Sequence, residues 1–300
     1  MTENRSSLTR FAWISIGASL LTLTLKSGAY LLTNSVGFLS DAVESLVNLA
    51  AGVMALAMLT VAARPADEDH AYGHSKAEYF SSAVEGILIL IAAGGIIVAA
   101  VQRFLDSQPL EQLGIGLVVS AVASLVNFAA ARVLFAAGKR AHSITLEADA
   151  HHLMTDVWTS VGVIAGVGVV AVTHWQPLDP IIAILVGLNI IRTAYQLLRR
   201  SVAGLMDASL PEAELKVIEA VMSRYRERGV AFHALRTRQA AARRFVSVHM
   251  LAPGAWTLHD AHHIAEDFEG DIRRELADTI VQTHLEPVDD EISMRDVHDR

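Results

Sequence analysis

The sequence predicts a membrane protein in which an all-α bundle of six transmembrane helices is followed by a small α+β domain. Three observations lead to this prediction. Hydrophobic residues make up 52% of the 300 residues, and the mean hydropathy is +0.38, which is too apolar for an ordinary soluble domain. Six apolar runs are each long enough to cross a hydrocarbon core of about 30 Å. After Arg200 these runs stop and charged residues become frequent.

The six predicted spans and the basic residues between them also give a topology. The spans lie at residues 11–32, 39–62, 81–104, 112–136, 146–173 and 179–198. Basic residues occupy one set of connections, at Arg5/Arg10, Arg64/Lys76, Lys139/Arg140 and Arg199/Arg200, whereas residues 33–38, 106–111 and 174–178 contain no Lys or Arg. The positive-inside rule then places both termini in the cytoplasm. We therefore expect a multi-pass protein of the cell (inner) membrane.

The soluble part is predicted to follow the order αββαβ. Ser209-Leu-Pro-Glu212 has the form of a capping box that opens a helix, and Gly229 is a suitable residue for its end. Strands are predicted at 236–239 and 244–251, a helix opened by Thr257 runs to about 276, and a third strand covers 279–285. This order favours a ferredoxin-like sheet with its helices on one face. The expected domains are residues 1–206, residues 207–290 and a flexible tail at 291–300.

Ionisable residues at membrane depth point to a cation site. His152 and Asp156 are one helical turn apart at the start of the fifth span, and Glu44 and Asn48 share a face of the second span. A charged side chain at the centre of a bilayer costs about 2.5–3.5 kcal/mol on insertion scales, so such residues usually face a cavity, a partner or an ion. We predict that these four side chains form one metal site. A histidine that is merely packed in a helix is the alternative for His152.

Two further groups have ligand chemistry, and the chain has no cysteine that could serve instead. The loop after the second span offers Asp67, His70 and His74 within eight residues. The soluble domain places four histidines and one acid at or near the ends of its elements, or on its second helix: His233, His249, His262, His284 and Glu286. These residues can converge on a metal centre, although solvated surface histidines are the alternative for each one. His259 and His263 are expected to remain at the surface.

The run Gly73-His-Ser-Lys-Ala-Glu78, together with the pairs in the second and fifth spans, resembles the cation diffusion facilitator family, and in particular its zinc and iron efflux members known as ferrous-iron efflux pumps. The resemblance covers nearly the whole chain. It implies a transport site between spans two and five, at Glu44, Asn48, His152 and Asp156. The second-span half departs from the family pattern, because Glu44 is one methylene longer than aspartate and Asn48 is neutral.

The same resemblance implies roles outside the transport site. Asp67, His70 and His74 match the family's second site, and Lys76 and Asp207 match charges that pair at the interface of a homodimer. The soluble domain is similar to the family's metallochaperone-like cytoplasmic domain, in which a two-metal centre braces the dimer. His233, His249, His262, His284 and Glu286 occupy the matching positions, with Glu286 in place of the usual aspartate.

The function that follows is proton-coupled antiport, which exports Zn²⁺ from the cytoplasm, with Fe²⁺ as the alternative cargo. Zn²⁺ is also expected as a structural or regulatory ion. The chain has no P-loop that would bind ATP, and its net charge of −8 argues against nucleic acid as a partner. Two alternatives remain: a non-transporting metal sensor or scaffold of the same fold, and an intramembrane metalloenzyme. The chain lacks the His-Glu-x-x-His motif, so we predict that it is not an enzyme.

Overall fold

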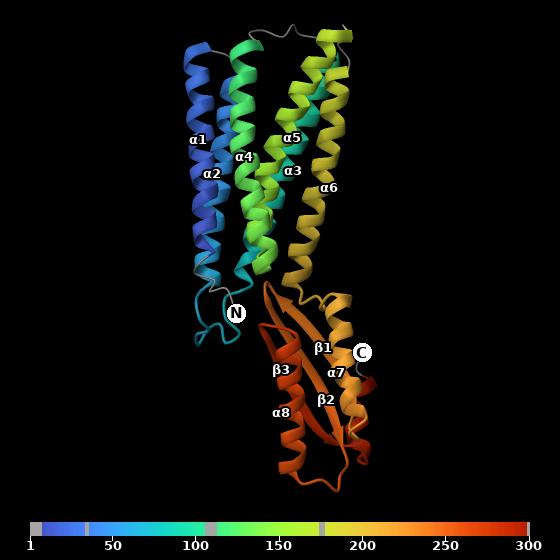
Figure 1. The fold of residues 1–300 in the computed structure, drawn as a ribbon. Helices are drawn as coiled ribbons and strands as arrows, with labels where there is room; N and C mark the ends of the chain where they lie inside the picture. Colours follow the sequence, from blue (N-terminus) through green and yellow to red (C-terminus); the bar gives the residue numbers. More distant parts are fainter. Residues whose placement is uncertain (1–7, 34–35, 106–112, 174–177, 299–300) are drawn as a thin grey trace. The chain divides into compact units, whose positions relative to one another are not determined.

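The computed structural model describes residues 8–33, 36–105, 113–173 and 178–298. The chain divides into two compact units, one within residues 3–202 and the other within residues 203–300. The first is built from helices alone, and the second combines helices with a small sheet (Figure 1). Each unit is described separately below.

The helical unit consists of six long helices that run alongside one another (Figure 1). They are α1 (Thr9–Thr33), α2 (Val36–Ala62), α3 (Ala77–Leu105), α4 (Leu113–Ala141), α5 (Ile144–Thr173) and α6 (Leu178–Leu205). Each helix occupies one of the six apolar runs. Among the side chains that the structure describes, Ala77–Gln102 and Val118–Ala141 are long and apolar enough to cross a bilayer. The predicted helical bundle is confirmed.

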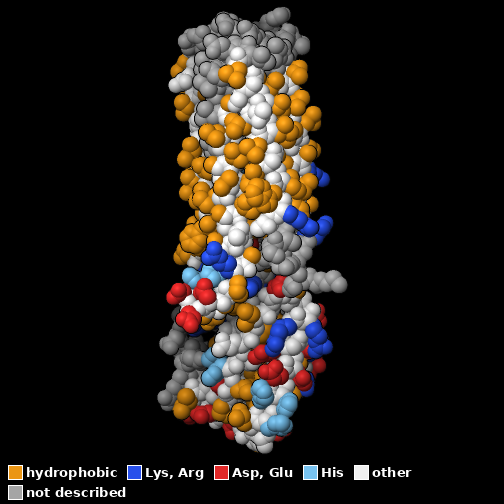
Figure 2. All heavy atoms as spheres, turned by 90° about the vertical axis from the view of Figure 1, so that its left-hand side faces the viewer, with side chains coloured by type: hydrophobic (Ala, Val, Ile, Leu, Met, Phe, Trp, Pro, Cys, Tyr) orange, Lys and Arg blue, Asp and Glu red, His pale blue; other side chains and the backbone are white. Residues whose placement is uncertain are grey.

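Small residues let these helices pack closely. A Cβ on Gly187 of α6 would lie 2.7 Å from Ile97 Cγ1 of α3, and a Cβ on Gly86 of α3 would lie 2.9 Å from Leu198 Cγ of α6. Close approach of helix backbones at small residues is typical of bundles in lipid, where water does not drive the helices together. Figure 2 shows apolar side chains over the visible face of the helical unit, as a lipid-facing surface requires.

The second unit has the predicted order αββαβ. Its elements are α7 (Glu212–Arg226), β1 (Ala231–Ala240), β2 (Arg243–Ala252), α8 (Leu258–Glu275), β3 (Thr279–Pro287) and the 3-10 helix η2 (Glu291–His298). β2 is the central strand; it pairs antiparallel with β1 and parallel with β3, because α8 forms the crossover between them. The sequence predicted the first strand at 236–239, which would place His233 before it. β1 in fact begins at Ala231, so His233 lies inside the strand.

The ends of the two helices differ in how they are capped. Thr257 caps α8, because its side chain accepts a hydrogen bond from the Asp260 backbone N–H. The capping box predicted at Ser209 is wrong: α7 starts after Pro211 with no side-chain cap, since the Ser209 hydroxyl instead bonds the Thr237 hydroxyl of β1 at 2.8 Å. That bond fixes the chain before α7 to the edge of the sheet.

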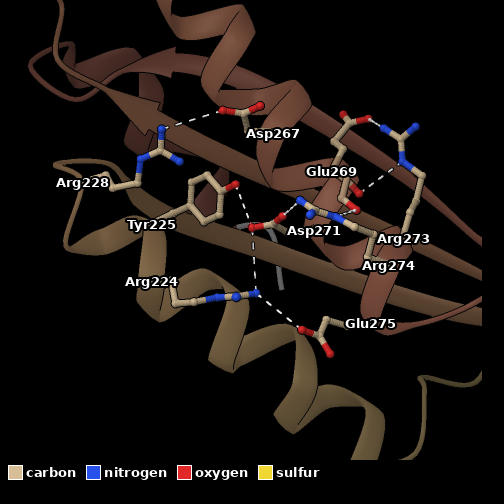
Figure 3. A network of polar contacts seen from close by, with 10 residues as sticks. Arg224, Tyr225, Arg228, Asp267, Glu269, Asp271, Arg273, Arg274 and Glu275 are labelled. Atoms are coloured by element: carbon tan, nitrogen blue, oxygen red, sulfur yellow. Dashed lines mark hydrogen bonds and ion pairs between the residues drawn. The ribbon is translucent and has the colours of Figure 1, made fainter.

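One face of the sheet packs against α7 and α8 and forms the core. Val246, Val248 and Met250 of β2 are buried against Ile218 of α7 and Phe268 of α8. A polar network joins the two helices above this core (Figure 3). In it the Tyr225 hydroxyl donates to Asp271 Oδ2 at 3.0 Å, and Arg228 lies 3.8 Å from Asp267. The opposite face of the sheet is therefore the one left for polar side chains.

Candidate metal centres

The side chains of α2 and α5 meet in the interior of the helical unit. Asn48, His152 and Asp156 are each at most 4% exposed. The Asn48 amide joins the other two: its Nδ2 donates to Asp156 Oδ2, and its Oδ1 is paired with His152 Nε2. Because a carbonyl oxygen only accepts, His152 carries its hydrogen on Nε2 in this arrangement. Three of the four predicted residues are thus in direct contact.

The fourth predicted residue is Glu44. Its side chain, like that of Asp41, lies outside the described residues, so its assignment to the site stays a prediction. Its backbone belongs to α2, one turn before Asn48. On a helix this spacing puts residues 44 and 48 on the same face.

A residue from a third helix also reaches this group. Asn127 of α4 is 2% exposed, and its Nδ2 donates to Asp156 Oδ2 at 3.0 Å. Sequence reasoning missed it, because α4 offers no second residue of a metal-ligating type near it that would indicate a ligand set. The available signal was a single amide in a mostly apolar run, with Ser124 as its nearest polar neighbour along the helix.

Two more acids are buried in the helical unit. Asp149, one turn before His152 on the same face of α5, accepts a hydrogen bond from the Ser15 hydroxyl of α1 at 2.9 Å. Glu85 of α3 accepts one from the Ser81 hydroxyl at 3.0 Å and lies within electrostatic reach of Asp149. Hydroxyl donors therefore partly compensate for burial of both carboxyl groups.

The loop between α2 and α3 brings together its three predicted ligands. The ligand atoms of Asp67, His70 and His74 lie within 4.8 Å of one another. His74 Nδ1 lies 3.1 Å from the Pro65 carbonyl, to which it can only donate, and this leaves Nε2 facing Asp67 Oδ2 at 3.3 Å. Such a backbone contact is a common way to orient a metal-binding imidazole.

The charge of Asp67 is favoured by its neighbours. Desolvation works to raise the pKa of Asp67, but hydrogen bonds from the His70 backbone and side chain, together with the nearby imidazoles, outweigh it and lower the pKa below its ordinary value. The carboxylate therefore remains anionic in mildly acidic conditions. An anionic oxygen between two imidazoles suits a divalent transition-metal ion.

The open face of the small sheet carries a row of histidines. His233 of β1, His249 of β2 and His284 of β3 are register partners across the three strands. Glu286 lies two residues beyond His284 on the same face and contacts all three rings: His233 Nε2 at 2.8 Å, His249 Nδ1 at 3.0 Å and His284 Nε2 at 3.4 Å. The ligand atoms of His233, His249 and Glu286 lie within 4.8 Å of one another.

A bulge in β1 aligns this row. Ala234 and Leu235 stand opposite the single residue Val248, and Ala234 has φ 51. His233 and Arg236 are three residues apart, and in a regular strand such residues point to opposite faces. Their partners His249 and Ser247 are two residues apart and share a face. The extra residue therefore lets both side chains lie on the open face. Left-handed backbone at a residue other than glycine costs about 1–3 kcal/mol.

Among the described residues, the three histidines of α8 are not part of this cluster within one chain. His262 lies on α8 and is exposed, with its ring centroid 6.0 Å from that of His263. His259 and His263 form a pair on the exposed face of α8, with ring centroids 4.4 Å apart. The structure thus brings together four of the five residues predicted for the centre, His284 as its most exposed member. The role of His262 stays a prediction.

Of the two charges predicted at a dimer interface, Asp207 has an ion-pair partner in its own unit. Its Oδ1 lies 3.3 Å from Arg238 Nη1. Arg238 in turn stacks on the Phe245 ring, with 3.9 Å between the guanidinium carbon and the ring centroid. The assignment of Lys76 and Asp207 to an interface stays a prediction.

An apolar helical unit with residues of metal-ligating type inside it, joined to a small α+β unit with a histidine cluster, is typical of a membrane protein that handles cations. Comparison with known proteins specifies the family. The model of the cation efflux transmembrane domain matches residues 12–206, and the model of the cation efflux protein cytoplasmic domain matches residues 210–288. The chain belongs to the cation efflux family, also known as the cation diffusion facilitators.

Two relatives agree with this assignment, and a solved structure matches part of the chain. An uncharacterized transporter of Synechocystis sp., sll1263, is 49% identical over 280 residues, which cover 93% of this chain and 90% of the relative. The cation-efflux pump FieF of Citrobacter koseri is 30% identical over 271 residues, covering 90% of this chain and 89% of the relative. A solved structure of CzrB in its Zn form is 26% identical, with a TM-score of 0.24, and covers 27% of this chain and 91% of that chain.

Proposed function

We propose that this cation efflux protein exports a divalent transition-metal ion from the cytoplasm in exchange for protons, with Zn²⁺ as the principal cargo and Fe²⁺ as the alternative. The observation that supports the proposal is the direct contact of Asn48, His152 and Asp156 inside the helical unit. We further propose that the protein crosses the membrane six times and has both termini in the cytoplasm.

The chemistry of the site fits exchange between a metal ion and protons. A metal can bind only to deprotonated ligand atoms, so protons and metal compete for His152 and Asp156. In the proposed cycle the ion displaces protons on the cytoplasmic side, the helices rearrange, and protons entering from the other side displace the ion. Whether the site opens to the cytoplasm or to the other side of the membrane then depends on whether the metal ion or protons occupy it, because a ligand shifts the population toward the conformation that it binds better.

The ligand set also bears on the choice of metal. One imidazole beside carboxylate and amide oxygens favours a borderline first-row dication, such as Zn²⁺ or Fe²⁺, over Ca²⁺ or Mg²⁺. We include Glu44 in this set because its place on α2 puts it on the face of Asn48. A flux assay with competing metals on the purified protein ranks the candidates.

The other two clusters are proposed to bind ions without carrying them. We assign Asp67, His70 and His74 to a loop site, and His233, His249, His284 and Glu286, with His262, to a centre in the cytoplasmic domain. Metal binding there would favour a homodimer and one packing of the transport helices. Lys76 and Asp207 are the candidate interface charges.

Zn²⁺ flux into proteoliposomes tests the transport site. His152→Ala and Asp156→Ala are each expected to abolish proton-coupled flux. In the described part of the site, the first change removes the only imidazole and the second removes the only carboxylate. Wild-type flux in either variant would show that the site is not used.

A matched control is available next to His152. His151 has the same chemistry, but its ring packs edge-on against Phe135 of α4 with centroids 4.7 Å apart. His151→Ala should therefore retain flux within about threefold of the wild type, because it changes packing against Phe135 and removes no proposed ligand. Equal losses in His151→Ala and His152→Ala would indicate disturbed folding and not a lost ligand.

A further inference from the structure

Asn127 of α4 belongs to the same hydrogen-bonded group as Asn48, His152 and Asp156. Its side chain is 2% exposed, and its amide Nδ2 donates to Asp156 Oδ2 at 3.0 Å. We propose that Asn127 is a further ligand of the transported ion, so that the transport site is built from α2, α4 and α5. This inference rests on the proposed function of the site.

The orientation of the Asn127 amide follows from its partner. A carboxylate has no hydrogen to give, so the amide must turn its NH₂ group toward Asp156 and its Oδ1 away. Among the described residues, Oδ1 of Asn127 has no hydrogen-bond partner, although it is buried. Buried amide oxygens nearly always have a partner, because an unpaired one loses its interaction with water without replacement. A cation is the kind of partner that such an oxygen accepts.

Asn48 differs from Asn127 in this respect. Both ends of the Asn48 amide are engaged, Nδ2 with Asp156 and Oδ1 with His152. Asn127 uses only its Nδ2 end. A dication held by Asp156 repels the NH₂ group that points at it. A half-turn of the Asn127 amide about its Cβ–Cγ bond exchanges NH₂ for Oδ1 at nearly the same place and presents the oxygen to the ion.

The resulting donor set contains the His152 imidazole, the Asp156 carboxylate and two amide oxygens. It has one formal negative charge among the described residues. A nitrogen with several oxygens suits Zn²⁺, Fe²⁺, Co²⁺ or Mn²⁺, whereas soft Cu⁺ prefers thiolate and thioether ligands. The neutral oxygens add coordination without adding a charge that would have to be buried when no ion is bound.

Two roles of Asn127 predict opposite effects of Asn127→Asp. If the amide only holds Asp156 by a hydrogen bond, aspartate cannot donate that bond and repels the Asp156 carboxylate, so the KM for Zn²⁺ rises. If Oδ1 coordinates the ion, the new carboxylate takes its place as a ligand, and the KM falls. The sign of the change in Asn127→Asp therefore distinguishes a ligand from a residue that only positions Asp156.

The experiment measures KM and kcat of Zn²⁺ flux in proteoliposomes for Asn127→Leu, Asn127→Asp and Ser124→Ala. We expect Asn127→Leu to raise the KM about tenfold, in line with the loss of an interaction with a charged group. Asn127→Asp should lower the KM about tenfold at pH 8, and this gain should shrink as the pH falls and protons compete. Ser124 lies one turn away on α4, and its hydroxyl donates to the Ser120 carbonyl of the same helix, so Ser124→Ala should leave the KM unchanged.

An unchanged or higher KM at pH 8 in Asn127→Asp overturns the proposal, and so does an unchanged or lower KM in Asn127→Leu. If Asn127→Leu does not fold, Asn127→Asp decides alone, because it keeps the shape of the side chain. Loss of flux in His152→Ala with unchanged KM in both Asn127 variants would refute the ligand role alone. Wild-type flux in His152→Ala would refute the transport site as well.

Discussion

The proposed transport site and the histidine row on the sheet are both proposed to bind a dication, but their surroundings differ. In the helical unit one carboxylate, Asp156, receives hydrogen bonds from the neutral amides of Asn48 and Asn127, and the group is almost fully buried. On the sheet one carboxylate, Glu286, is surrounded by three imidazoles, and its side chain and two of the rings are 11–22% exposed. The partly exposed cluster on the sheet thus contains more ionisable side chains than the described part of the buried site.

This difference follows from the free energy of burying charge. A charge inside a bilayer is costly unless hydrogen bonds or an opposite charge compensate it, and amides can do so without a charge of their own. Imidazoles near water can gain or lose a proton at little cost. We therefore expect the buried site to release its ion readily and the sheet cluster to retain its ion.

The largest effect is expected from Glu286, the one acid in the sheet cluster. Glu286→Gln should weaken Zn²⁺ binding to this cluster about a hundredfold and lower the zinc content of the full-length protein, since the carboxylate contacts all three rings. Metal content after dialysis against a weak chelator measures the effect. The exposed Glu291→Gln is the control, and equal zinc content in both variants would contradict the assignment.

A smaller effect of opposite sign is expected from Asn48→Asp. This change adds a carboxylate to the buried site, so Zn²⁺ should bind about tenfold more tightly at pH 8. The cost of two adjacent carboxylates without an ion should make binding depend more steeply on pH, since one of them must lose a proton when the metal binds. If the KM for Zn²⁺ between pH 6 and 8 depends on pH no more steeply in Asn48→Asp than in the wild type, residue 48 does not touch the ion.

The histidines of the sheet should form a graded series. His233→Ala and His249→Ala should each weaken Zn²⁺ binding about tenfold, whereas His284→Ala should have about a threefold effect, because its ring is 67% exposed and its nitrogen is 3.4 Å from Glu286. Competition with a chromogenic chelator measures all three variants. An effect of His284→Ala as large as that of His249→Ala would show that His284 is a full ligand.

Hydropathy alone located all six helices of the bundle, because an apolar run of about 20 residues has few other stable states. The contact of Asn48, His152 and Asp156 followed the predicted spacing, since positions on one helix face point to the same neighbour. Asn127 could not be found in this way, because its role depends on which helix packs beside α5. The bulge at Ala234 was equally hidden, as it depends on the pairing of β1 with β2.

The smallest effect is expected away from both sites, in the network between α7 and α8 (Figure 3). Tyr225→Phe removes one hydrogen bond to Asp271, which keeps an ion pair with Arg274, so the cytoplasmic domain should lose about 1 kcal/mol of stability. Burial, the hydrogen bond to Asp271 and the charge of Asp271 raise the pKa of Tyr225 to about 12. Because the phenol loses its proton more easily in the unfolded chain, wild-type stability should fall as the pH rises from 10 toward 12. Chemical denaturation followed by tyrosine absorbance measures this slope, and a slope as steep in Tyr225→Phe would assign it to other groups.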